Sequence, residues 1–300
     1  MIEPDEKNKA NGMNRADVPN KRETRAEQVP MLSTFIETRQ YHRFVEVGLA
    51  CQQNGFIAIC HGEAGVGKTR SARCLTHWDQ MERQLSREAG GEGSGGESKV
   101  AFFTPDALMS AKRLEQEILH LHAQMKRLTS LEPPLMSSPG VPRGGYRVTG
   151  LEWKLLVIDE ADRVKPMGLE VLRDLFDRSQ MGLMLIGMPG IEKRLARYPQ
   201  FFSRVGFVHE FCALSAGELR EIVEEQLRLV KRDGEEDLPT TEALDEEALA
   251  AIIRMTSGNF RLIHRLLVQI ERILRINHLS KVTKAVVEAA RASLVFGREG

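Results

Sequence analysis

An eight-residue segment, Gly62–Thr69, combines the residue types that bind phosphate. It reads GEAGVGKT and fits the spacing G-x-x-x-x-G-K-[ST]. Glycines let backbone N–H groups curl around an anion, and the N-terminus of a following helix adds partial positive charge. We expect Lys68 to reach the β- and γ-phosphates of a nucleotide and the Thr69 hydroxyl to bind Mg²⁺. The segment therefore predicts a nucleotide-binding loop formed by Gly62, Glu63, Ala64, Gly65, Val66, Gly67, Lys68 and Thr69.

Two carboxylates follow a later apolar run. The segment Leu155–Arg163 reads LLVIDEADR, so Asp159 and Glu160 come directly after a stretch that suits a buried strand. One carboxylate at such a position can hold Mg²⁺, and a second can orient and deprotonate an attacking water. Alternatively, the pair faces solvent at the end of a strand. The complete phosphate loop upstream favours Asp159 as a metal ligand and Glu160 as a general base.

Elements that would position these residues can be read from the apolar runs. Five short runs are separated by helical stretches, which predicts a parallel α/β sheet with right-handed crossovers. The ligand site of such a sheet lies at the carboxyl ends of its strands, where both motifs fall. We expect a helix over Arg39–Gln53 and one helix over Thr69–Leu85. The strands are predicted at Phe56–Cys60, Val100–Pro105, from Leu155 to the acids, Leu183–Gly187 and Phe207–Phe211.

Composition divides the chain into three parts. Residues 1–28 hold six basic and six acidic side chains and almost no large apolar ones, so we expect a flexible polar tail or a partner-binding arm. Residues 29–212 contain the motifs and the five predicted strands. Residues 213–300 are helical throughout, and Ser215 with Glu218 forms a capping box at their start. Stretches rich in Gly, Ser or Pro predict long loops at 87–98 and 132–150.

Bulk properties exclude some classes of protein. The chain has 42 basic and 42 acidic residues, so its net charge predicts neither a nucleic acid nor a membrane partner. The four cysteines are scattered, which favours reduced thiols over a disulfide framework or a zinc site. No apolar run approaches the length of a membrane span, and the N-terminal residues do not form a secretion signal. We therefore expect a cytoplasmic protein.

The two motifs together resemble the Walker A and Walker B motifs of AAA+ ATPases. With the segments 187–207 (GMPGIEKRLARYPQFFSRVGF) and 289–297 (AARASLVFG), the chain most resembles the transposition-regulator ATPases of the TniB, TnsC and MuB group. This resemblance implies a P-loop AAA+ core, with a parallel five-stranded sheet sandwiched by helices, followed by an all-α lid domain. It also implies ATP and Mg²⁺ as cofactors, a homo-oligomer with ATP at subunit interfaces, and double-stranded DNA and a transposase as partners.

The same resemblance assigns two arginines. Arg204 matches the arginine finger that acts on a neighbouring subunit's ATP, with Arg194 and Arg197 as competitors, and Arg261 matches the sensor-2 arginine of the lid. A surface salt bridge for Arg204 and a helix-surface charge for Arg261 stay open. The fourth strand ends in Gly187 and Met188, without the polar sensor-1 residue of the family, which predicts slow hydrolysis. An initiator-like or ExeA-like secretion ATPase, or a signalling NTPase that does not bind DNA, remains an alternative.

The helical region shows a charge split. Residues 233–250 carry eight acids and no base, whereas residues 251–284 carry seven bases and one acid. Arg261, Arg265, Arg272 and Arg275 have the spacing of one helical face. Such a face could follow DNA phosphates, or it could pair with the acidic segment inside the protein. If the DNA contact lies elsewhere, the basic residues after the second strand are the alternative: Lys112, Arg113, Lys126 and Arg127.

Overall fold

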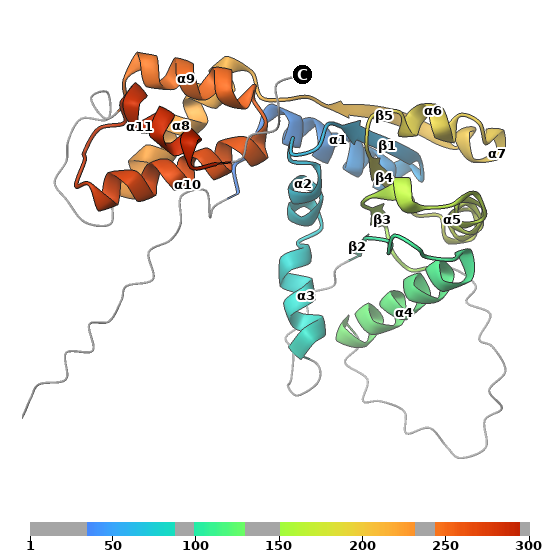
Figure 1. The fold of residues 1–300 in the computed structure, drawn as a ribbon. Coiled ribbons are helices and arrows are strands. Elements are labelled where there is room, and N and C mark those ends of the chain that lie inside the picture. Colours follow the sequence, from blue (N-terminus) through green and yellow to red (C-terminus); the bar gives the residue numbers. More distant parts are fainter. Residues whose placement is uncertain (1–34, 88–98, 130–150, 232–243, 295–300) are drawn as a thin grey trace, which may run out of the picture.

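A computed structural model describes residues 35–87, 99–129, 151–231 and 244–294 of the chain. The polar tail predicted at 1–28 lies outside these residues, as do the predicted loop at 132–150 and residues 88–98. Within the described part, one five-stranded sheet carries the phosphate loop, and a group of helices follows it along the chain (Figure 1).

The sheet is parallel and has the strand order β2-β3-β4-β1-β5. β3 and β4 are buried at every position, because helices cover both faces of the sheet. β5 lies at an edge and alternates between exposed and partly buried residues. The predicted α/β fold class is confirmed. The strands are β1 (Ile57–Gly62), β2 (Val100–Phe103), β3 (Leu155–Ile158), β4 (Gly182–Gly187) and β5 (Val205–Phe211).

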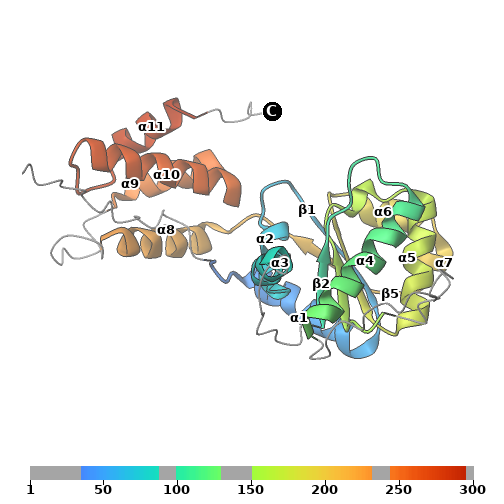
Figure 2. The ribbon, with the colours of Figure 1, turned by 90° about the horizontal axis from the view of Figure 1, so that it is seen from below.

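Helices lie on the two faces of this sheet (Figure 2). One face is covered by α1 (Arg39–Asn54), α2 (Lys68–Leu75) and α3 (Trp78–Arg87). The other is covered by α4 (Ala111–Thr129), α5 (Pro166–Ser179), α6 (Ile191–Leu195) and α7 (Pro199–Phe202). A single 3₁₀ turn, Ala161–Arg163, follows the acidic end of β3. This doubly covered arrangement leaves the carboxyl ends of the strands as the place where polar side chains can gather.

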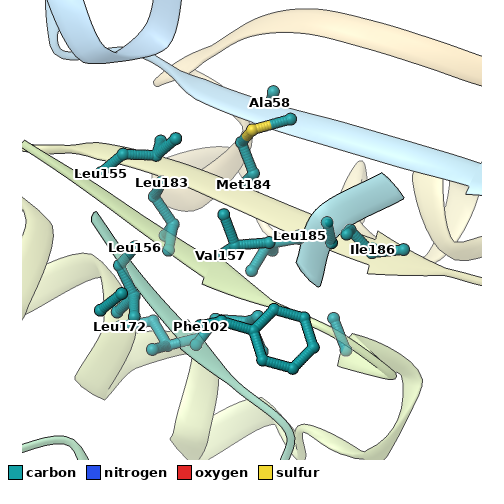
Figure 3. Close-up of a cluster of buried hydrophobic side chains, with 14 of the residues drawn as sticks. Ala58, Phe102, Leu155, Leu156, Val157, Leu172, Leu183, Met184, Leu185 and Ile186 are labelled. Carbon is teal, nitrogen blue, oxygen red and sulfur yellow. The ribbon is translucent and has the colours of Figure 1, made fainter. Parts of the chain in front are cut away.

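The core is formed where strand side chains meet the covering helices. Leu172 of α5 packs on Leu156 of β3 beside Phe102 of β2, and Met184 of β4 lies next to Ala58 of β1 (Figure 3). Leu156, Met184 and Ala58 are fully buried. Each buried leucine or methionine side chain contributes roughly 1.5–3 kcal/mol relative to an exposed one. The core therefore fixes the strands whose ends carry the two motifs.

The helix expected over Thr69–Leu85 is two helices. α2 ends at Leu75, where the Thr76 hydroxyl donates to the Ala72 carbonyl at 2.8 Å. His77 then adopts a left-handed conformation with φ 50°, and α3 starts at Trp78. The break redirects the chain so that Trp78 is buried against Phe102, with ring centroids 5.8 Å apart. The single-helix prediction was wrong because this tertiary contact outweighs the helical pattern.

The helices after β5 form a second hydrophobic cluster with members from each of them. They are α8 (Ala216–Lys231), α9 (Glu246–Thr256), α10 (Phe260–Ile276) and α11 (Lys284–Ala292). The predicted capping box is present, because the Glu218 N–H donates to Ser215 Oγ at 3.3 Å and the Ser215 N–H donates to Glu218 Oε2 at 3.1 Å. The domain limits at residues 28 and 212 stay predictions. The helices after β5 have a hydrophobic cluster of their own, and Ile36, from the segment before α1, packs against it.

Membrane and thiol features are simple in the described part of the chain. None of its helices is both long and apolar enough to cross a bilayer. Cys51 and Cys60 are buried thiols in the core, Cys74 is partly buried, and Cys212 is exposed. Burial raises the pKa of the Cys51 thiol to about 12, so this thiol is neutral at ordinary pH.

Candidate nucleotide-binding site

A cavity of about 680 Å³ lies at the carboxyl ends of β1, β3 and β4. Its floor is the phosphate loop, and the acidic end of β3 lines it beside the loop. α10 lines the opposite part, so that the sheet and the following helices both contribute. The cavity brings together the predicted site residues Ala64, Gly65, Val66, Gly67, Lys68, Thr69, Asp159, Glu160 and Arg261.

The backbone of the phosphate loop explains two of its glycines. Gly65 and Gly67 have φ angles of 86° and 106°, which side chains rarely adopt. Gly62 is required for another reason: a Cβ there would collide with the Phe211 carbonyl of β5. Gly62 therefore lets two strands approach each other, whereas Gly65 and Gly67 shape the turn in front of α2.

Lys68 stands at the first position of α2, with its ammonium group among backbone oxygens. Nζ donates to the carbonyl of Gly62 and, at 2.8 Å, to that of Glu63. Burial lowers the pKa of Lys68, and the charges of Asp159 and Asp162 oppose this shift. A bound phosphate would supply a stronger acceptor for the same ammonium group.

Thr69 and Asp159 meet across the floor of the cavity. The Thr69 hydroxyl donates to Asp159 Oδ2 at 2.6 Å, and Asp159 is only 3% exposed. Asp159 Oδ1 accepts from the Glu160 N–H at 2.9 Å, which fixes the carboxylate. A hydroxyl and a carboxylate next to a phosphate loop form the donor set that Mg²⁺ takes together with phosphate oxygens. The residues present therefore fit a magnesium ion held by Thr69 and Asp159.

Glu160 lines the same cavity in a constrained conformation. Its φ of 49° lies in the left-handed region, and its carboxylate forms an ion pair with Arg163. Arg163 also donates to the Pro105 carbonyl at 2.9 Å, beyond the end of β2. Glu160 therefore lines the cavity together with the phosphate loop, and its carboxylate is paired with Arg163.

The end of β4 is hydrogen-bonded to a carboxylate whose position the sequence did not reveal. Gly187 and Met188 line the cavity, and the Met188 N–H donates to Asp162 Oδ2 at 2.7 Å. The carboxylate at this place thus comes from the turn after β3 rather than from β4 itself. Asp162, the third acid of the segment DEADR, was the signal in the sequence. Only the fold shows that its carboxylate reaches the neighbouring strand.

α10 supplies the cations on the other side of the cavity. Arg261 lies there, as the resemblance implies, and so does Arg265. Arg265, which the spacing places on the same helical face as Arg272 and Arg275, lines this cavity, and the DNA contact of that face stays a prediction. His264 lies between Arg261 and Arg265, and burial together with the charge of Arg70 lowers its pKa, so its imidazole is neutral at neutral pH.

Apolar side chains line part of the cavity, and sequence reasoning missed them. Phe35 and Ile36 precede α1, and Phe260 is the first residue of α10. These segments are more than 200 positions apart in the chain, so no local pattern could have paired them. With neutral His264, they provide a surface suited to a flat aromatic base.

Arg204 does not line this cavity. Its carbonyl accepts from the Ile57 N–H at 3.1 Å, at the amino end of β1, whereas Gly62 ends that strand. Five residues of strand separate the two ends by roughly 17 Å. The guanidinium instead binds Asp177 through two contacts, of 2.5 and 2.7 Å.

The competitor Arg194 has a different role. Its guanidinium donates to the carbonyls of Ala161 at 2.8 Å and Asp162 at 2.9 Å. Arg194 therefore stabilises the turn that follows the acidic end of β3, and its partners belong to the same chain.

Three acidic residues of residues 233–250 lie in the described part of the chain. Each forms an ion pair with a base that does not belong to the predicted arginine face. Asp245 binds Lys281 at 2.7 Å, Glu246 binds Arg220 at 2.7 Å, and Glu247 lies 3.9 Å from Lys284. Arg275 binds Glu271 of its own helix at 2.6 Å. The acids between 233 and 242 lie outside the described residues.

Comparisons with known proteins agree with this geometry. Residues 52–195 match the model of an AAA domain. A potential ATP-binding protein of Staphylococcus aureus is 39% identical over 275 residues, which cover 88% of this chain and 97% of that protein.

Solved structures share the fold at low sequence identity. The ORC2 protein of Aeropyrum pernix is 15% identical, with a TM-score of 0.56 over 89% of this chain and 69% of that one. RuvB of Thermotoga maritima, a Holliday junction branch migration motor, is 17% identical, with a TM-score of 0.52 over 89% and 72%. The phosphate loop, the paired Thr69 and Asp159, and the Staphylococcus relative lead to one conclusion: the chain belongs to the family of that potential ATP-binding protein, and its residues 52–195 match an AAA domain.

Proposed function

We propose that this protein is an ATP-hydrolysing switch that oligomerises on double-stranded DNA and recruits a transposase, and so regulates transposition or its target selection. ATP binding follows from the family and the site. Hydrolysis, the oligomer, the DNA and the transposase are the steps that the proposal adds. The transposase rests on the resemblance of this sequence to the TniB, TnsC and MuB group.

The position of Arg204 is the observation that carries the oligomer. A strand length of roughly 17 Å separates it from its own phosphate loop, so it can complete only a neighbour's site. Its pair with Asp177 does not prevent this, because ion pairs between partly exposed side chains contribute about 0–1 kcal/mol. In such an assembly ATP lies at the subunit interface, and Arg204 of one subunit stabilises charge on the phosphates held by the next.

Within one subunit, the chemistry would be divided among the residues of the cavity floor. Lys68 binds the phosphates, and Glu160 accepts a proton from the attacking water once it leaves Arg163. Mg²⁺, held by Thr69 and Asp159, would neutralise charge that develops on the phosphate oxygens. Because Glu160 is paired and Met188 offers no side-chain donor, turnover is slow, which suits a switch rather than a motor.

DNA binding is proposed for the part of the α10 face that lies beyond the cavity. Arg272 and Arg275 are exposed and follow Arg265 along the helix, toward its C-terminal end. Arg275 keeps a partner on its own helix, Glu271, and such a surface pair exchanges readily for a phosphate. Arg261 and Arg265 serve the nucleotide, so one helix would face both ligands.

Electron microscopy of the protein with a slowly hydrolysed ATP analogue, with and without duplex DNA, tests this proposal. The expected result is a ring or filament that needs the analogue and encloses or coats DNA. Particles that stay monomeric in both conditions would contradict it. An assembly that never associates with DNA would favour the signalling NTPase. An assembly on DNA that does not retain added transposase would favour the initiator-like class.

A further inference from the structure

The first turn of α10 lies directly on the phosphate loop, and one side chain joins the two. Asn259 is the N-cap of α10: its Oδ1 accepts from the N–H groups of Arg261 at 3.1 Å and Leu262 at 3.3 Å. Its Nδ2 donates to the carbonyl of Ala64 at 2.8 Å. The acceptor end of the amide therefore holds the helix, and the donor end holds the loop.

A backbone bond and close packing reinforce this contact. The Arg261 N–H donates to the Gly65 carbonyl at 3.1 Å as well as to Asn259. A Cβ on Gly65 would lie 2.5 Å from Asn259 Oδ1 and 3.0 Å from the Cβ of Arg261. Gly65 thus serves two purposes, since it shapes the loop and admits the cap of α10.

The same turn is also held from its other side. The Leu214 N–H, on the segment between β5 and α8, donates to the Gly258 carbonyl at 3.0 Å. Gly258 has a φ of 73°, and a Cβ there would collide with the Leu214 carbonyl. The turn before α10 is therefore fixed between the connection from the sheet and the phosphate loop, and a displacement of α8–α11 would act on the loop.

We propose that Asn259 is a positioning residue that latches the helices after β5 to the phosphate loop and so places Arg261 in the cavity. The latch rests only on ATP binding, and it is independent of DNA and transposase. By linkage, ATP binding would stabilise the latch contact by the same free energy by which that contact stabilises bound ATP. A neighbouring subunit that moves these helices would therefore change nucleotide affinity.

The variant Asn259→Ser separates the latch from the cap. Serine is neutral and caps helices well, but it lacks the amide donor that reaches Ala64. Removal of one net hydrogen bond should weaken the affinity for a fluorescent ATP analogue about 3- to 10-fold. The matched control is Asn277→Ser at the C-terminal end of α10. The side-chain amide of Asn277 donates to the Ile273 carbonyl of its own helix. This control should bind the analogue as the wild type does.

A double-mutant cycle with Arg261→Ala gives a readout that a purely structural role would not move. If the latch works by placing Arg261, Asn259→Ser should change affinity less than about 2-fold once Arg261 is gone. Full, additive losses in both backgrounds would overturn the positioning role, and so would wild-type affinity of Asn259→Ser. A loss equal to that of Asn277→Ser would overturn it as well.

Hydrogen exchange and melting complete the test. Analogue binding should slow amide exchange in residues 258–264 of the wild type more than in Asn259→Ser, and equal protection would contradict the latch. If Asn259→Ser melts well below Asn277→Ser, Asn259→Thr takes its place as a second neutral cap without the amide.

Lys68→Ala is the reference for lost binding. A wild-type protein that bound no better than Lys68→Ala would refute ATP binding itself, which is a different failure from a latch variant that binds normally.

Discussion

Lys68, Thr69 and Asp159 are held by hydrogen bonds that connect the strand ends to the first turn of α2. The Lys68 ammonium group donates to loop carbonyls, and the Thr69 hydroxyl donates to the almost fully buried Asp159 carboxylate. Groups ordered in this way lose little conformational entropy when a ligand arrives. At the scale of single residues, the site is thus prepared for a phosphate before one binds.

Substitution of Lys68 should remove nucleotide binding. Lys68→Ala leaves the phosphates without the ammonium group, and we expect at least about a 100-fold loss of affinity for a fluorescent ATP analogue, since charge-assisted bonds are the strong ones. Lys126→Ala is the control, because that lysine is exposed on α4 and binds Glu152. An unchanged affinity in Lys68→Ala would remove the phosphate-loop assignment.

Glu160 should be needed for turnover but not for binding. Glu160→Gln keeps the shape of the side chain but cannot accept a proton, so hydrolysis should fall by about 10²–10⁴ while analogue affinity stays within about 3-fold. ATP-dependent assemblies should last longer as a result. Glu152→Gln, an exposed glutamate on the chain before β3, serves as the control. Wild-type turnover by Glu160→Gln would show that the base is another residue.

Local spacing was sufficient to predict the residues of the loop and the acids after β3. It was insufficient for Asn259, which contacts the loop from 195 positions away, and for Asp162, whose carboxylate reaches the neighbouring strand. These contacts exist only because the sheet order and the return of α10 bring distant segments together. A single sequence carries no local signal for such pairs.

At the scale of elements, the strands followed their apolar runs closely, and the helices less so. α1 begins at the predicted residue, and its buried residues are Phe44, Gly48 and Cys51, whereas Leu49 is 46% exposed. A Cβ on Gly48 would lie 2.9 Å from Leu75 of α2, so the glycine allows the two helices to approach. Periodicity indicated the helix, but packing selected which face is buried.

The exposed end of the α10 face gives a prediction about salt. If Arg272 and Arg275 contact DNA phosphates, the double change to alanine should lower the slope of log K against log salt by about 1.8, at 0.9 for each contact. Sequence preference should hardly change, because phosphate contacts do not read bases. Affinity measured by fluorescence anisotropy at several salt concentrations would show this.

The comparison variant for that measurement is Lys112→Ala with Arg113→Ala, on α4. A normal slope for the α10 double variant and a lower slope for the α4 variant would move the DNA contact to α4. A lower melting temperature without a change in slope would instead assign Arg272 and Arg275 to stability.

At the scale of the whole molecule, the cavity is formed by two hydrophobic units that meet at the phosphate loop. The sheet supplies phosphate and metal ligands, and α10 supplies Arg261. Arg204 lies at the amino end of β1 and does not line this cavity. In the proposed assembly, each subunit would contain both a site to be completed and the group that completes another. This arrangement predicts a head-to-tail assembly, in which the same contact is repeated from subunit to subunit.

Mixed assemblies test the shared site most directly. Arg204→Ala alone should lower ATPase activity by about 10³-fold or more, and Glu160→Gln alone should lower it by about 10²–10⁴ for a different reason. In an equal mixture with duplex DNA, about a quarter of random interfaces pair an intact Arg204 with an intact Glu160, so ATPase activity should recover to about a quarter of the wild-type rate. If labelled subunits are shown to mix and the activity stays at the level of the separate variants, the ATP site is not shared between subunits and the central claim is wrong.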